Sequence, residues 1–200
     1  MSNASHALID PGQAFEESFH ESRVLRLFSE RLNQCQAPLV LDMGPTFGNN
    51  IHFFATKAKK LFICDMFVHL DEMSRSRLPA KKAFQYLVFP PGHFDGILLW
   101  NLIDYLDTGN ASELVRLVYK ITKPRGMVVL LAQDLHKPSG VPIAFSIRDE
   151  CRLYPQPLSA LDLPAKYRQT REILDIMNPF ALVKSFICRN GVREYLFARP

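Results

Sequence analysis

The chain has 200 residues, 48% hydrophobic and 22% charged, a composition typical of one globular domain with a sizeable core. Its formal net charge of +4 is mild and its basic residues are dispersed, which gives no clear nucleic-acid footprint. No apolar run is long enough to span a bilayer and residues 1–13 lack the layout of a signal peptide, so we expect a disordered lead and a cytoplasmic protein.

The cysteines are scattered along the sequence. None of Cys35, Cys64, Cys151 and Cys188 belongs to a C-x-x-C pair or has a neighbouring histidine. This pattern predicts reduced thiols that pack as small residues, and it predicts no metal site.

The first part of the chain alternates helical and strand patterns. Apolar periodicity predicts, in order, an amphipathic helix at 14–33, a buried strand at 39–43, a helix at 49–59, a second buried strand at 61–64 and a helical segment at 66–77. A glycine-flanked turn, Gly44 to Gly48, joins the first strand directly to the next helix. A strand that ends in such a turn is how an open α/β sheet presents backbone N–H groups to a nucleotide-like ligand.

The alternation continues in the middle of the chain. The pattern predicts a third strand at 84–89, a fourth strand at 94–100, a helix at 111–121 and a fifth strand at 127–132. Short links between alternating strands and helices require right-handed crossovers, and therefore a parallel sheet.

The last part of the chain departs from this alternation. Residues 133–164 are rich in Pro, Asp, Arg and Tyr and predict an excursion or lid, in which 141–147 forms a short strand. A helix at 168–177 follows, and then strands at 180–188 and 192–198 joined by an Asn-Gly tight turn. We therefore expect a single α/β domain with a Rossmann-like open sheet. It is mostly parallel, with seven strands, a C-terminal antiparallel hairpin and helices on both faces.

Four motifs stand in a specific order along these elements. They are the glycine turn led by Asp42, Asp65 after the second strand, the fourth-strand segment at 94–101, and the turn Lys123-Pro124-Arg125-Gly126 before the fifth strand. Together they resemble the class I S-adenosylmethionine-dependent methyltransferase family, and the chain is similar to uncharacterised bacterial methyltransferase-domain proteins. The resemblance implies S-adenosyl-L-methionine as the cofactor.

Eight residues are candidates for the cofactor site. Glycines let the backbone approach the methionine end without a Cβ clash. Asp65 lies 23 residues after Asp42, near the offset at which a second-strand carboxylate accepts hydrogen bonds from both ribose hydroxyls. The resemblance implies that Met66 or Phe67 lies against the adenine and that residues 100–102, beginning with Trp100, line the floor beneath the sulfonium. The candidates are Asp42, Gly44, Thr46, Gly48, Asp65, Met66, Trp100 and Asn101.

Structural roles stay open for several of these residues. Asp65 is also placed to cap the next helix, Asp42 to brace its own loop, and Trp100 to fill the core. Thr46 stands where the family usually has glycine, so it either donates its hydroxyl to the cofactor or weakens binding. Residues 85–91 lack the acidic residue that can hold the adenine amino group in the family.

Methyl transfer from a sulfonium is an in-line displacement, so positioning supplies much of the acceleration and a base is needed only when the acceptor must lose a proton. Candidates for catalysis lie in loops after the fourth and fifth strands: Asp104, Tyr105 and His136. No N-P-P-Y-like segment follows the fourth strand, which disfavours methylation of adenine or glutamine amino groups.

Three functions remain open at this point. The first is S-adenosylmethionine-dependent methyl transfer to an unidentified acceptor, with a small molecule as the favoured class. The second is a catalytically inactive, methyltransferase-like binding or scaffold module. The third is another nucleotide-binding enzyme, such as an NAD(P) dehydrogenase, although the turn reads Gly44-x-x-x-Gly48 and not G-x-G-x-x-G.

Overall fold

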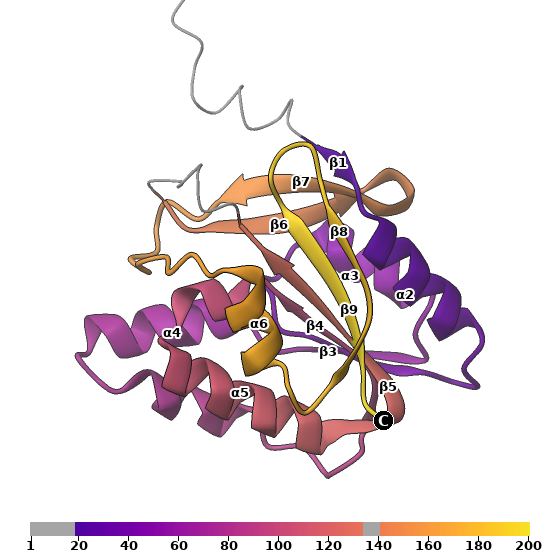
Figure 1. Cartoon of the computed structure of the whole chain (residues 1–200), viewed down its shortest axis with the longest axis horizontal. Helices are drawn as coiled ribbons and strands as arrows, with labels where there is room; N and C mark the ends of the chain where they lie inside the picture. Colours follow the sequence, from indigo (N-terminus) through magenta and orange to yellow (C-terminus); the bar gives the residue numbers. More distant parts are fainter. Residues whose placement is uncertain (1–18, 134–140) are drawn as a thin grey trace, which may run out of the picture.

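The computed structural model describes residues 19–133 and 141–200, and its centre is a six-stranded sheet (Figure 1). The strand order is β3-β2-β4-β5-β9-β8. The strands are β2 (Leu39–Asp42), β3 (Lys60–Ile63), β4 (Phe94–Trp100), β5 (Thr122–Ala132), β8 (Ala181–Ile187) and β9 (Arg193–Ala198). The first four run parallel, and β9 lies antiparallel to both β5 and β8. The predicted parallel sheet with a closing antiparallel hairpin is confirmed.

Helices cover both faces of this sheet, as predicted. They are α2 (Arg23–Asn33), α3 (Gly48–Ala55), α4 (Met66–Arg75), α5 (Thr108–Ile121) and α6 (Thr170–Ile176). One hydrophobic cluster packs α4, α5 and α6 against one face, and a second packs α2 and α3 against the other. Because both faces are covered, β4 is a nearly continuous apolar run, and its residues from Gly96 to Trp100 are all buried.

The first helix is shorter than predicted. Helix α2 begins after Ser22, whose hydroxyl caps it by accepting a hydrogen bond from the backbone N–H of Leu25 at 3.0 Å. The two residues before this cap form strand β1 (His20–Glu21) and not a helical turn. The predicted lead at 1–13 lies outside the described residues. Among the helices of 19–133 and 141–200, none is long and apolar enough to cross a membrane.

Strand β1 belongs to a second, three-stranded sheet with the order β1-β7-β6. Strands β6 (Ile143–Arg148) and β7 (Arg152–Pro157) form an antiparallel hairpin within the predicted excursion, and β1 pairs with β7. The short strand predicted at 141–147 is therefore confirmed, whereas β7 was not predicted. Figure 1 shows this small sheet at the top of the view, at one end of the six-stranded sheet.

The strand predicted at 84–89 is wrong. Residues Ala80–Tyr86 form the 3-10 helix η1, and no described strand lies between β3 and β4 along the chain. Phe84 and Leu87 are buried at a spacing of three, which suits a 3-10 turn, while Val88 is 84% exposed. The main sheet consequently has six described strands instead of seven, and β3 forms its edge.

Other boundaries follow local chemistry. Helix α5 starts three residues earlier than predicted because the side chain of Asp107 caps it, accepting from the backbone N–H of Asn110 at 2.8 Å. The predicted hairpin turn is confirmed, with Gly191 at a φ of +86°. None of the four cysteines, all of which lie in the described ranges, forms a disulfide.

Candidate functional site

The candidate site lies at the carboxyl ends of β2, β3 and β4. From β2 the chain moves outward to β3 and then returns to β4 on the other side of β2. Such a reversal of strand order creates a crevice at the carboxyl ends of the strands, where ligands of open α/β sheets bind. The predicted glycine turn, Gly44 to Gly48, leaves β2 at this point and leads into α3.

Trp100 fills one side of the glycine turn. Its indole Nε1–H donates to Oδ1 of Asp42 at 2.6 Å, and the backbone N–H of Gly44 donates to the same oxygen at 2.9 Å. A Cβ atom on Gly44 would lie 2.6 Å from both Cδ1 and Nε1 of the indole. Position 44 therefore needs glycine because Trp100 approaches the backbone closely.

The backbone of Trp100 adopts a rare conformation. Its φ is +51°, which is unusual for a bulky residue, and the whole residue is only 1% exposed. The chain leaves β4 here and forms the short 3-10 helix η2 (Leu102–Tyr105). Such a conformation persists only where the surrounding contacts determine it, and the contacts to Asp42 and Gly44 are of that kind.

Asp42 is a buried carboxylic acid with donors from the protein itself. Burial raises its pKa to about 6, although the hydrogen bonds from Trp100 and Gly44 act in the opposite direction. The bracing role that was left open for this residue is therefore present. On this side of the turn, the carboxylate of Asp42 already accepts hydrogen bonds from two groups of the protein itself.

The other side of the turn is open. Thr46 and Gly48 are exposed, and a Cβ atom on Gly48 would have no heavy atom within 4 Å. Thr46 is not among the residues with a positive φ, so threonine at this position carries no glycine-type backbone strain. The backbone N–H of Thr46 lies near the carboxylate of Asp65 and acts to lower its pKa, so the turn lies beside the end of β3.

Asp65 caps helix α4. Its Oδ1 accepts a hydrogen bond from the backbone N–H of Val68 at 3.2 Å. Burial raises the pKa of this half-buried carboxyl group, and backbone hydrogen bonds partly offset the effect. The capping role that was left open for Asp65 is confirmed, and its ribose-binding role stays a prediction.

Two further cofactor candidates are buried. Met66 is 0% exposed, lies in the hydrophobic cluster under α4, and donates its N–H to the carbonyl of Met43 at 3.3 Å. Asn101 is also 0% exposed, and its Nδ2 donates to the carbonyl of Ile143 at 2.8 Å. Neither side chain lines an open surface in this structure.

The excursion is fastened over this end of the sheet. Asn50 in α3 donates from Nδ2 to the carbonyl of Phe145 at 3.1 Å and accepts from the N–H of Ile147 at 2.7 Å. Together with Asn101, it holds strand β6 between helix α3 and the end of β4. Sequence reasoning missed Asn50, since nothing in the pair Asn49-Asn50 signals a contact with residues 95 and 97 positions away.

Comparisons with known proteins agree with this topology. No family model and no curated protein matches the chain, but many solved structures do. An S-adenosylmethionine-dependent methyltransferase from Mesorhizobium loti aligns with a TM-score of 0.58 and 14% identity over 86% of this chain and 96% of that one. The N-methyltransferase NodS from Bradyrhizobium japonicum WM9, in complex with S-adenosyl-L-homocysteine, aligns with a TM-score of 0.53 and 16% identity. This alignment covers 89% of this chain and 87% of NodS.

The pyocyanin biosynthetic protein PhzM aligns with a TM-score of 0.50 and 18% identity over 86% of this chain, which spans only 54% of PhzM. The chain has the class I S-adenosylmethionine-dependent methyltransferase fold.

This methyltransferase fold brings the eight candidate residues to one end of the sheet but divides them. Asp42, Gly44 and Trp100 contact one another, and Thr46 and Asp65 lie near each other on the open side.

The catalytic candidates of this methyltransferase fold are enclosed where they are described. Asp104 is 0% exposed, and its Oδ2 accepts from the backbone N–H of Gln133 at 3.0 Å. Burial raises its pKa to about 7, and its Oδ1 has no hydrogen-bond partner among the described residues. The Tyr105 hydroxyl accepts from the N–H of Ile143 at 2.9 Å, and burial raises its pKa to about 12. His136 lies outside the described residues.

Proposed function

We propose that this protein is an S-adenosylmethionine-dependent methyltransferase that binds its cofactor on the open side of the glycine turn. One observation carries the proposal: Thr46 and Gly48 are exposed in the turn, and the backbone of Thr46 lies near the Asp65 carboxylate, at the point where the strand order reverses. The same fold in NodS was solved with S-adenosyl-L-homocysteine, which supports the choice of ligand.

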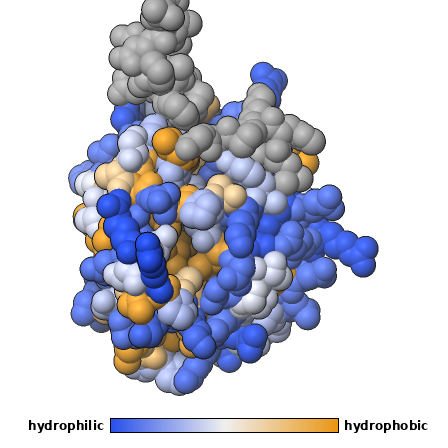
Figure 2. All heavy atoms as spheres, turned by 90° about the vertical axis from the view of Figure 1, so that its left-hand side faces the viewer, coloured by the Kyte–Doolittle hydropathy of each residue, from blue (hydrophilic) through white to orange (hydrophobic). Residues whose placement is uncertain are grey.

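The chain offers the groups that this cofactor needs on that side. A carboxylate has two acceptor oxygens, so Asp65 can accept from ribose hydroxyls while it caps α4. Ile63 and Val68 are 39% and 47% exposed on either side of Asp65 and offer apolar surface to an adenine. Figure 2 shows the side of the molecule on which α4 lies, with apolar side chains gathered between hydrophilic flanks.

The cofactor would supply an electrophilic methyl group, and the protein would supply position and a dry environment. We infer a small-molecule acceptor, because β6 narrows the end of the sheet between α3 and β4. Asp104 is the candidate base for an acceptor that must lose a proton, because its pKa of about 7 suits proton transfer near neutral pH. It is buried in the described structure, so this role requires a conformational change that exposes its carboxyl group to the acceptor.

Calorimetric titration with S-adenosylmethionine and S-adenosylhomocysteine tests the cofactor assignment. We expect saturable binding by the wild-type chain and a loss of about 10- to 100-fold in affinity for Asp65→Asn, which still caps a helix but offers only one acceptor oxygen. Asp107→Asn is the matched control, since the side chain of Asp107 caps α5 by accepting from the backbone N–H three residues later, as Asp65 does in α4. Equal binding by Asp65→Asn and wild type would show that Asp65 serves only as a cap.

A second function is favoured by a specific observation. Trp100 occupies the space beside Gly44 and donates a hydrogen bond to the carboxylate of Asp42. The resemblance assigns both Gly44 and Asp42 to the cofactor site. A methyltransferase-like binding or scaffold module would need neither group free. If the wild-type chain binds neither S-adenosylmethionine nor its product, the enzyme proposal fails and this alternative stands.

A further inference from the structure

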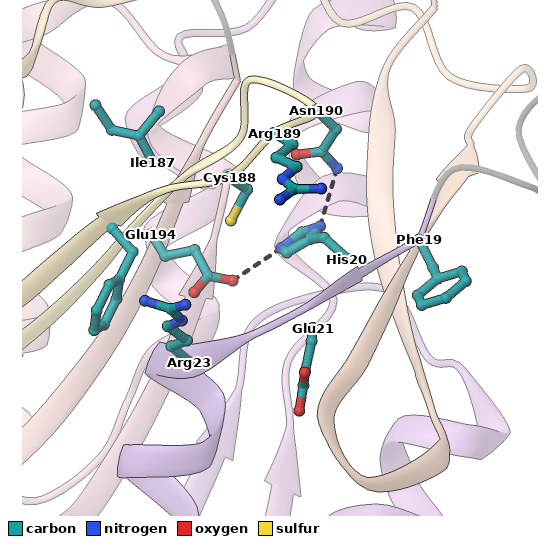
Figure 3. Close-up of a pocket in the computed structure, with 10 residues that line it drawn as sticks. Phe19, His20, Glu21, Arg23, Ile187, Cys188, Arg189, Asn190 and Glu194 are labelled. Atoms are coloured by element: carbon teal, nitrogen blue, oxygen red, sulfur yellow. Dashed lines mark hydrogen bonds and ion pairs between the residues drawn. The ribbon is translucent and has the colours of Figure 1, made fainter.

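Three metal-ligating side chains meet at a second place, in a pocket that none of the glycine-turn residues lines. Figure 3 shows His20, Cys188 and Glu194 pointing toward one another from three segments of the chain. Their ligand atoms all lie within 4.8 Å of one another. Within residues 19–133 and 141–200, this is the one group of three or more histidine, cysteine and acidic side chains with that spacing.

The backbone around the cluster is well fixed. Glu194 lies in β9 between β5 and β8, is 0% exposed, and accepts the N–H of Val24 on Oε2 at 3.2 Å. Cys188 follows β8 and donates its backbone N–H to the carbonyl of Val192 at 2.8 Å across the hairpin. His20 is held in β1, which pairs with β7. The three side chains therefore come from backbone segments that are paired or hydrogen-bonded to neighbouring segments.

His20 is held through both ring nitrogens. Its Nε2 lies 2.9 Å from Oε1 of Glu194, and its Nδ1 lies 3.0 Å from Nδ2 of Asn190. A polar partner on the second nitrogen of a histidine is the usual support of a metal-bound imidazole, because it fixes the ring orientation. Nδ1 must carry the proton once Nε2 binds a metal. The Asn190 amide would then turn its Oδ1, which now accepts from the N–H of Val192 at 3.2 Å, toward Nδ1–H.

The cluster lies in the wall of a pocket of about 780 Å³. Phe19, Phe186 and Ile187 supply apolar lining, and Arg23 and Arg189 also border the space. In Figure 3 the guanidinium groups of both arginines lie on the side of the three ligating side chains. A fourth ligand at the cluster could therefore enter from the pocket, and the arginines favour an anionic one.

We propose that His20, Cys188 and Glu194 bind one Zn²⁺ ion through Nε2, Sγ and a carboxylate oxygen, with the fourth position open to the pocket. Imidazole, thiolate and carboxylate are the ligands that zinc takes in proteins, and three protein ligands with one open position are typical of reactive zinc sites. The proposal is independent of the cofactor assignment at the glycine turn.

The geometry requires only small shifts. Zinc bonds of about 2.0 to 2.3 Å separate tetrahedral ligand atoms by about 3.3 to 3.6 Å. The Nε2 and Oε1 atoms, now 2.9 Å apart, would move apart by a few tenths of an ångström, and the thiol would approach them. The ion would displace the proton between histidine and carboxylate, and that of the thiol, as metals do when they coordinate these groups.

Zinc titration of the chelator-treated 200-residue chain against a chromophoric competitor tests the site. We expect one equivalent bound by wild type. With Co²⁺ in place of Zn²⁺, we expect a thiolate-to-cobalt charge-transfer band that disappears in Cys188→Ser. Asn190→Ala should weaken zinc binding about 10- to 100-fold, since it removes the support of His20.

Cys35→Ser is the matched control, because Cys35 is also half-buried but interacts with the carbonyl of Arg31, away from the cluster. It should keep both the stoichiometry and the cobalt band. Circular dichroism of Cys188→Ser checks that the variant is folded, which the half-buried position of Cys188 favours. No zinc binding by wild type, or a cobalt band that survives in folded Cys188→Ser, overturns the proposal and leaves a hydrogen-bonded pair that joins β1 to β9.

Discussion

The two sides of the glycine turn differ in what occupies them. At Gly44 an indole packs against the backbone and the nearby carboxylate of Asp42 is buried. The space beside Gly48 is open, and Asp65, at the end of β3, is half-buried. A single motif thus serves two purposes, internal packing on one side and a candidate ligand surface on the other. The comparison predicts that substitutions on the first side change stability strongly, and those on the second side change it weakly.

Replacement of Trp100 should have the largest effect. Trp100→Ala removes a large side chain that is 1% exposed and leaves a cavity, so we expect a loss of about 3–5 kcal/mol in the free energy of unfolding. Urea denaturation measures this change. Val88→Ala, at a position that is 84% exposed, should change stability by less than about 0.5 kcal/mol. A cost for Trp100→Ala below about 1 kcal/mol would mean that the indole does not hold this side closed.

The pH dependence of stability should expose the burial of Asp42. Its pKa is about 6 in the folded protein and 3.8 in the reference state, so the folded state binds more protons between these values and stability falls as pH rises. The difference in unfolding free energy between wild type and Asp42→Asn should therefore fall by up to about 3 kcal/mol from pH 4 to pH 7. The pKa of Asp104 is raised as well, but Asp104 is present in both wild type and Asp42→Asn, so its contribution to the pH dependence cancels in the difference.

Asp107→Asn provides the opposite case. The hydrogen bond from the backbone of Asn110 lowers the pKa of Asp107, so its contribution to stability is lost as pH falls. Chemical denaturation at several pH values should show slopes of opposite sign for the two variants, each relative to wild type. Slopes of the same sign would mean that Asp42 titrates like an accessible acid.

The two glycines of the turn should respond differently to alanine. Gly44→Ala places a Cβ atom 2.6 Å from the indole, and we expect it to cost about 1–3 kcal/mol in unfolding free energy. Gly48→Ala enters open space at the first position of α3 and should be neutral or stabilising by up to about 1 kcal/mol. In a Trp100→Ala background the cost of Gly44→Ala should shrink, because the clashing group is gone.

Loss of the cap at Asp65 should have only a small effect on stability. Asp65→Ala and Asp107→Ala each remove a side chain that accepts from a backbone N–H at a helix start, so each should cost about 1 kcal/mol by thermal or urea unfolding. Only Asp65→Ala should also reduce the stabilisation that added S-adenosylmethionine gives. Equal stabilisation of both variants by the ligand would contradict a cofactor role for Asp65.

Much of the fold could be predicted because its signals are local. Buried strands appear in the sequence as apolar runs, and capping residues directly precede their helices. The Asn-Gly pair predicts the turn of the closing hairpin. The segment at 84–89 was mistaken for a strand because six residues cannot distinguish a period of two from a 3-10 period of three. Tertiary contacts of Phe84 and Leu87 decide between them.

The candidate sites were predictable only in part, because their decisive contacts are distant in the sequence. The loop, Asp42 and Asp65 follow from a strand, a turn and their spacing. The contact between Trp100 and Asp42 spans 58 residues, and that between His20 and Glu194 spans 174. No spacing rule for cysteine reaches over such separations, so the cluster around Cys188 could be found only once the chain was folded.

The position of β9 has a consequence for the order in which the chain folds. Although β9 follows β8 in the sequence, it lies between β5 and β8, and β8 pairs with no other described strand. Residues 181–187 therefore cannot join the sheet before 193–198 have paired with β5. Until β9 has paired with β5, the edge of β5 has unpaired backbone N–H and C=O groups, which makes this interval the one most open to aggregation.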